Sequence, residues 1–153
     1  MRRISTAVAP PSPRTWSGSW PSASAPSGTT DIRGCSERSE EHRQVVGVHG
    51  NVDSPGLRSE LPESISLDLD GVTLAVIHDA GPAKGRLDRL RARFPDAGAV
   101  IFGHSHMPLH EERDGFQIFN PGSPTERRRA PSRSMGEATI ANGRIELRLL
   151  TLP

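Results

Sequence analysis

Short apolar runs alternate with polar, glycine-containing turns along most of this chain, and this pattern predicts β-strands joined by loops. Two dipeptides that favour tight hairpin turns, Asp70-Gly71 and Asn142-Gly143, each separate a pair of such runs. Apolar residues at helical spacing, with arginines between them, predict a helix over 84–94. The predicted strands are 45–49, 66–69, 72–77, 99–102, 116–119, 137–141 and 144–152.

Residues 1–44 do not follow this pattern. They are rich in Ser, Pro, Arg and Thr, and both tryptophans, Trp16 and Trp20, lie there without an apolar pattern to pack against. A segment of this composition cannot bury enough surface to offset its ordering entropy. The sequence therefore predicts a low-complexity, disordered segment over 1–44 and one α/β domain over 45–153.

Composition excludes several classes of partner. Lys84 is the one lysine among 19 basic residues, and we attribute the arginine excess to a GC-rich genome because the net charge is only +1. With 4% aromatic residues and no tyrosine, we expect no base-stacking platform and no stable nucleic-acid complex. The single cysteine, Cys35, excludes an internal disulfide framework and favours a reducing compartment. No apolar stretch reaches membrane length and no secretory leader is evident, so a cytoplasmic protein is expected.

Polar, glycine-containing loops follow three of the predicted strands and contain the candidate functional residues. These loops contain Asn51, His78, and the pair His104 and His106. If the strands share a sheet, the loops meet at the carboxyl edge, where ligands bind in α/β proteins. One amide oxygen and three imidazoles suit Zn, Mn, Fe or Ni better than Ca or Mg.

Other residues in the same loops are expected to support these ligands or to face a substrate. Gly50 and Gly103 allow tight turns and a close approach of the backbone to an ion. Asp53 and Asp79 are turn-forming residues by default, and each could also orient a neighbouring ligand. The run 127–129, three arginines, is a solvated surface by default and could also attract anionic substrates.

The order of these motifs resembles that of a known family. Gly50-Asn51-x-Asp53, a strand ending at His78, Gly103-His104-x-His106 and Asn120-Pro121-Gly122-Ser123 together resemble the calcineurin-like metallophosphoesterases, closest to their small bacterial phosphodiesterase branch. The resemblance covers about residues 45–152. It implies a two-sheet α/β sandwich flanked by helices, here incomplete at the N-terminus.

The resemblance also implies an activity, the hydrolysis of phosphodiesters by a metal-activated hydroxide. The substrate class would be a small phosphodiester or a nucleotide-like molecule. Two ions serve this reaction in the family, and manganese is expected here, with zinc, nickel or iron as alternatives. Asn51, His78 and His104 resemble the ligands of one ion, and His106 resembles the last ligand of the other. No catalytic residue is assigned beyond these metal ligands.

The chain departs from the family in two places. Val52 stands where many members carry a histidine that assists the leaving group. The family's N-terminal Asp-x-His and Gly-Asp motifs, which supply the first ion's ligands and the bridging aspartate, are absent from residues 1–44. We therefore expect at most one well-held ion and impaired activity, and we hypothesise that 1–44 is translated out of frame. The alternative is a non-catalytic interaction scaffold of the same fold.

Overall fold

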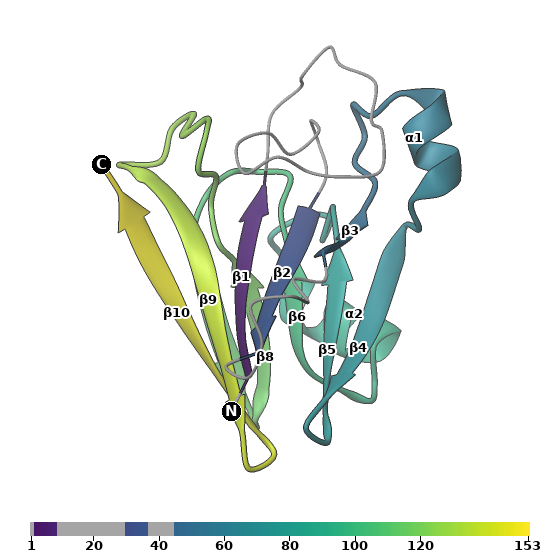
Figure 1. Ribbon diagram of the computed structural model, residues 1–153, viewed down its shortest axis with the longest axis vertical. Coiled ribbons are helices and arrows are strands. Elements are labelled where there is room, and N and C mark those ends of the chain that lie inside the picture. Colours follow the sequence, from purple (N-terminus) through teal and green to yellow (C-terminus); the bar gives the residue numbers. More distant parts are fainter. Residues whose placement is uncertain (1, 9–29, 37–44) are drawn as a thin grey trace.

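A computed structural model of the chain describes residues 2–8, 30–36 and 45–153, with side chains from residue 46 onward. In this part of the chain ten strands and two helices follow one another (Figure 1). They are β1 (Arg2–Val8), β2 (Thr30–Ser36), β3 (Val45–Val48), α1 (Pro55–Glu60), β4 (Ser64–Leu69), β5 (Val72–Ile77), α2 (Arg86–Arg93), β6 (Ala97–Phe102), β7 (Leu109–Arg113), β8 (Phe116–Asn120), β9 (Arg133–Ala141) and β10 (Arg144–Leu152).

The strands form two five-stranded sheets, with the orders β10-β9-β1-β2-β3 and β4-β5-β6-β8-β7. The second sheet is mixed, since β5, β6 and β8 run parallel while β4 and β7 pair antiparallel at its two edges. All seven predicted strands and the predicted helix are confirmed, with small shifts of their ends. The expectation of a mixed α/β domain is therefore confirmed.

The two sheets pack face to face over a shared apolar core (Figure 1). Val48 and Ile140 of the first sheet pack with Leu74, Ile101 and Phe119 of the second, and none of the five is more than 1% exposed. The parallel strands β5 and β6 bury both faces, which explains their continuous apolar sequences.

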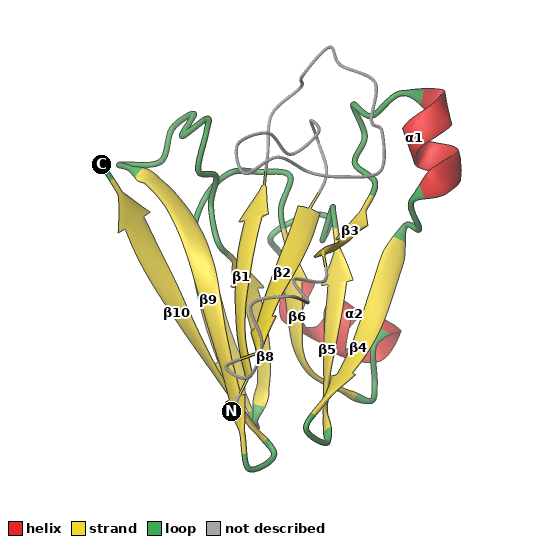
Figure 2. Ribbon diagram, in the orientation of Figure 1, coloured by secondary structure: helices red, strands yellow, loops and turns green. Residues whose placement is uncertain are grey.

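The outer face of the second sheet is covered by α2, and Figure 2 shows both helices outside the sheets. Leu90 of α2 is 2% exposed and packs with Phe102 and Ile118, while Leu87 and Phe94 flank it. This is the apolar face that the helical spacing predicts. By contrast, α1 buries none of its residues and lies beside the end of the second sheet.

Tight turns at one end of the molecule connect the antiparallel strands. Asp70-Gly71, Asp114-Gly115 and Asn142-Gly143 each have positive φ at both positions, as a two-residue type I′ hairpin turn requires. The second of these turns joins β7 to β8. The sequence pattern predicts no strand over the residues of β7, and the structure shows them as an antiparallel edge strand.

Two strands lie in the segment predicted to be low in complexity. β1 pairs with β9, and β2 pairs with β3, both antiparallel, so these two strands fill the centre of the first sheet. These two strands contradict the prediction that the whole of 1–44 is disordered. The rest of 1–44 lies outside the described residues. The domain boundary at residue 44 stays a prediction. In the described part of the chain, no helix combines the length and apolar character needed to span a membrane.

Candidate metal centre

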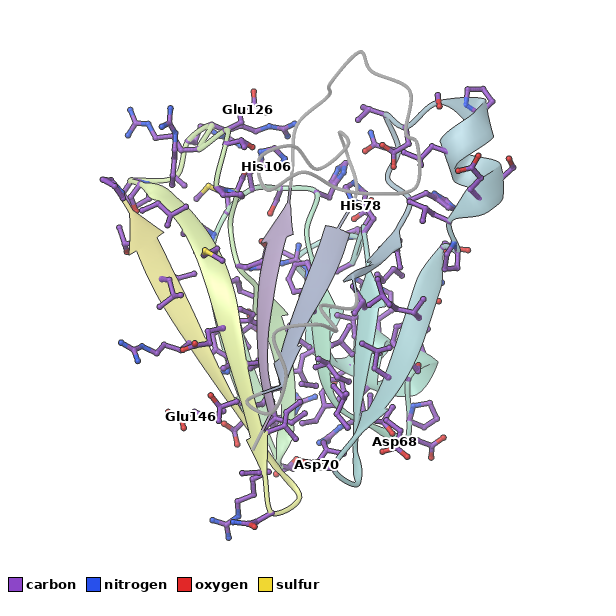
Figure 3. All side chains as sticks on the ribbon, viewed as in Figure 1. Asp68, Asp70, His78, His106, Glu126 and Glu146 are labelled. Carbon is purple, nitrogen blue, oxygen red and sulfur yellow. The ribbon has the colours of Figure 1, made fainter. Side chains whose placement is uncertain are left out.

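Parallel strands carry two of the predicted loops to the same edge of the second sheet. β5 and β6 both end there, and the Gly103 amide donates to the His78 carbonyl at 2.9 Å, which ties the two loops together. His78 and His106 lie at this end of the molecule and Asp70 at the opposite end (Figure 3). The expected convergence at the carboxyl edge is thus found for these loops.

Three side chains from three loops meet at this edge. Nε2 of His78 is 3.1 Å from Oδ1 of Asn51 and 3.3 Å from Nδ1 of His104. The two imidazole rings are close to perpendicular, at 86°, with their centroids 5.3 Å apart. Two nitrogens bound to one ion at about 2.1 Å in tetrahedral geometry would stand about 3.4 Å apart. Both distances from His78 Nε2 therefore match the spacing of neighbouring ligand atoms around a single ion.

The central residue of this cluster, His78, is buried and uncharged at neutral pH. Burial, followed by the positive charge that His104 would carry, lowers the pKa of His78 to about 4. A neutral imidazole is the form that binds a metal ion, because a protonated ring has no free lone pair.

Backbone conformation sets the direction of the histidine loop. His104 and His106 have φ of 64° and 58°, in a left-handed region that side chains with a Cβ rarely occupy. Asn120, which is fully buried, holds this loop: its Nδ2 donates to the Gly103 carbonyl at 2.8 Å and to Oγ of Ser105 at 3.1 Å. Such strained residues persist where the surroundings hold them, and they concentrate at functional sites.

His106 has a different environment from the other two histidines. Its Nδ1 lies 2.9 Å from the carbonyl oxygen of Glu126 and 3.6 Å from the Glu126 carboxylate (Figure 3). Burial lowers the pKa of His106, and the hydrogen bond to the Glu126 carbonyl opposes that shift. Because Nδ1 faces the Glu126 carbonyl, Nε2 is the ring nitrogen that could bind a metal ion. No sequence pattern selects Glu126 as a site residue, because no characteristic spacing relates it to His106.

The two aspartates have turn-forming roles. Oδ2 of the buried Asp53 accepts from the Gly50 amide at 2.6 Å and so closes the loop that carries Asn51. Asp79, which is exposed, accepts from the Gly81 amide at 2.8 Å. Asp53 thus supports the cluster, while the contact seen for Asp79 is that of a local turn.

A cavity of about 430 Å³ opens beside the cluster. Asn51, His78 and Asp79 line it, together with Arg58 of α1 and Glu63. Sequence patterns did not select Arg58 or Glu63. His49, Gly50 and Ile77 complete the lining.

The described residues at this edge could hold one transition-metal ion. Within the described residues, no group of three or more His, Cys, Asp or Glu side chains forms a metal site. The convergence therefore depends on the Asn51 amide as third ligand, and amide oxygen with two imidazoles suits a borderline transition metal.

Sequence comparison with protein families agrees with this arrangement. The model of the calcineurin-like phosphoesterase superfamily domain matches residues 29–143. The chain belongs to this superfamily. The family is metal-dependent. The matched range includes all three loops of the cluster and the Asn120 turn.

Individual relatives place this phosphoesterase domain among small prokaryotic proteins. It is 30% identical, over 112 residues, to a probable metallophosphoesterase of Methanocaldococcus jannaschii, covering 71% of this chain and 55% of that protein. A Thermotoga maritima protein solved in solution is 32% identical, with a TM-score of 0.52 over 69% of this chain and 64% of the other. The fold is also that of a predicted phosphoesterase from Streptococcus pneumoniae, at 22% identity and a TM-score of 0.57 over 68% and 60% of the two chains. The chain spans about half the length of the curated relatives it matches.

Proposed function

We propose that this chain is a metal-dependent phosphodiesterase domain with a single well-formed ion site. The observation that carries the proposal is the convergence of Asn51 Oδ1, His78 Nε2 and His104 Nδ1 within hydrogen-bonding distances at the sheet edge. A divalent transition ion held there would lower the pKa of a coordinated water and polarise a phosphoryl oxygen. Manganese is the proposed ion, with zinc, nickel or iron as alternatives.

The chain's own residues would perform three tasks in this reaction. Asn51, His78 and His104 would hold the ion, and the neutral state of His78 keeps its lone pair free for it. Asn120 and Asp53 would keep two of the loops in position through their buried hydrogen bonds. The cavity beside Asn51 would receive the ester. With Val52 in place of a histidine, we propose diesters over monoesters as substrates.

We further propose that activity is weaker than in a two-ion member of the family. We assign His106 to a second ion, and within the described residues no group of three or more His, Cys, Asp or Glu side chains forms a further site. Translation of residues 1–44 out of frame would explain why the family's N-terminal motifs are missing. Translating the locus in all frames tests this, because an Asp-x-His and a Gly-Asp must then occur in another frame.

Hydrolysis of bis(4-nitrophenyl) phosphate with added Mn²⁺ tests the main proposal. We expect slow turnover that is lost in His104→Ala and kept in His110→Ala, because His110 lies on the edge strand β7 and bonds to Gln117. A chain that folds but shows neither turnover nor uptake of Mn²⁺ would instead be an interaction scaffold. Equal rates in the two variants would contradict the assignment of the site.

A further inference from the structure

Two acids, Glu63 and Asp79, and one arginine, Arg58, line the cavity beside the metal cluster. Glu63 is already paired, since its Oε1 accepts from Nη2 of Arg93 at 2.8 Å. Arg58 lines the same cavity, and among the residues that the structure describes no carboxylate pairs with its guanidinium. Asp79 accepts from the Gly81 amide, so within the described residues neither carboxylate of the lining forms an ion pair with Arg58.

The position of Arg58 is set by structure that belongs to the site itself. The loop that carries Asn51 runs into α1, whose first turn is capped by Ser54: its Oγ accepts from the Leu57 amide at 3.3 Å, and Pro55 begins the helix. The Arg58 amide donates to the Ser54 carbonyl at 3.0 Å. One turn of helix therefore fixes where Arg58 stands relative to Asn51.

Other arginines near the cluster are committed to structural contacts. The Arg128 side chain lies 3.4 Å from the His104 carbonyl and 3.5 Å from the Glu126 carboxylate. Arg127 donates to the Pro131 carbonyl at 3.0 Å. These contacts neutralise or anchor the two guanidinium groups, whereas Arg58 is the arginine that lines the cavity among the described residues.

We propose that Arg58 binds the anionic phosphoryl group of the substrate. A phosphodiester carries one negative charge shared by two non-bridging oxygens, and the planar guanidinium can donate to both at once. Arg58 thereby selects anionic esters and sets their orientation toward Asn51 and His78. This inference rests on the proposed function for its substrate class, although the anion site itself can be measured without turnover.

Kinetics give the first test. Arg58→Ala is expected to raise the KM for bis(4-nitrophenyl) phosphate about tenfold, with a smaller change in kcat, because a charge-assisted hydrogen bond is lost. Arg58→Lys keeps the charge without the two-pronged geometry and should recover part of that loss. Arg148→Ala, which removes an exposed arginine from β10, matches the change in net charge and should leave the KM unchanged. An unchanged KM in Arg58→Ala would overturn the proposal.

Binding of inorganic phosphate separates this inference from the proposed function. The Nε–Hε resonance that disappears from the NMR spectrum in Arg58→Ala is that of Arg58. In the wild-type chain, phosphate should shift this resonance. The Arg148→Ala variant should bind phosphate as well as the wild-type chain does. If phosphate binds through Arg58 but no ester is hydrolysed, the anion site stands and the catalytic proposal fails. If esters are hydrolysed but phosphate leaves the Arg58 resonance unmoved, the anion site is wrong.

Discussion

The side-chain amide of Asn120 donates to the carbonyl of Gly103 at 2.8 Å, and this buried contact joins the end of β8 to the histidine loop. The same Asn120 accepts from the Gly122 amide at 2.9 Å, so both halves of its side chain are used. The turn that begins at Asn120 therefore supports the loop, and not the ion directly.

Replacing Asn120 with alanine is expected to destabilise the chain and weaken the metal site together. Losing the Asn120 side-chain amide leaves the Gly122 amide without its acceptor and removes one of the two donors to the Gly103 carbonyl, the other being the Ser105 amide, at a cost of about 1–3 kcal/mol. Chemical denaturation and Mn²⁺ titration measure the two effects. Asn120→Asp keeps the acceptor for Gly122 but loses the donor, so it should resemble alanine in metal affinity. Full affinity in either variant would contradict this role.

Gly122 is required by both its backbone conformation and its surroundings. Its φ is +76°, and an added Cβ would clash with Oγ of Ser134 and lie 3.0 Å from Cγ of Pro108. We expect Gly122→Ala to lose about 1–3 kcal/mol from steric crowding in addition to the conformational cost. Gly143→Ala is the matched control, since Gly143 has a φ of +71° with open space around it. Equal losses in the two variants, measured by urea denaturation, would show that crowding plays no part.

Some elements could be predicted from sequence because their signals are local. The apolar runs of β5 and β6 and the Asn142-Gly143 turn depend on a few neighbouring residues, and the structure follows them closely. The strand β7 was missed because four of its five residues are exposed and carry no alternation. The sequence signal for β7 is the dipeptide that follows it, Asp114-Gly115, which forms the same kind of hairpin turn as Asn142-Gly143.

The helix α1 shows how two local signals can conflict. Ser54-Pro55-Gly56 reads as a turn, yet Ser54 at the N-cap followed by Pro55 is also a helix start. In the site, the loop residues Asn51, His78 and His104 could be selected from their positions after strands. The contact of His106 with Glu126 could not be predicted from the sequence, because it depends on the path of a long loop between β8 and β9.

Low pH should weaken the ion pair between Glu63 and Arg93 of α2. The hydrogen bond and charge of Arg93 lower the pKa of Glu63 below its usual 4.5. A carboxylate whose pKa is lowered in the folded state contributes stability above the pKa of the unfolded chain, and this contribution is lost as the pH falls through the folded pKa. In an NMR titration of the carboxyl carbons, Arg93→Ala should return the pKa of Glu63 toward 4.5. Arg91→Ala, whose guanidinium bonds to the Arg113 carbonyl, should not move it.

Metal removal gives the most direct measure of the cluster. An ion that binds only the folded chain stabilises it by about 2.7 kcal/mol when its concentration is one hundred times the dissociation constant. Mn²⁺ should therefore raise the thermal midpoint of the wild-type chain, and a chelator should reverse the shift. His104→Ala should abolish it, because one of the three converging ligands is lost. His110→Ala should retain it. Calorimetry should give one ion per chain, and two tightly bound ions would contradict a single well-formed site, since the described residues supply ligands for one.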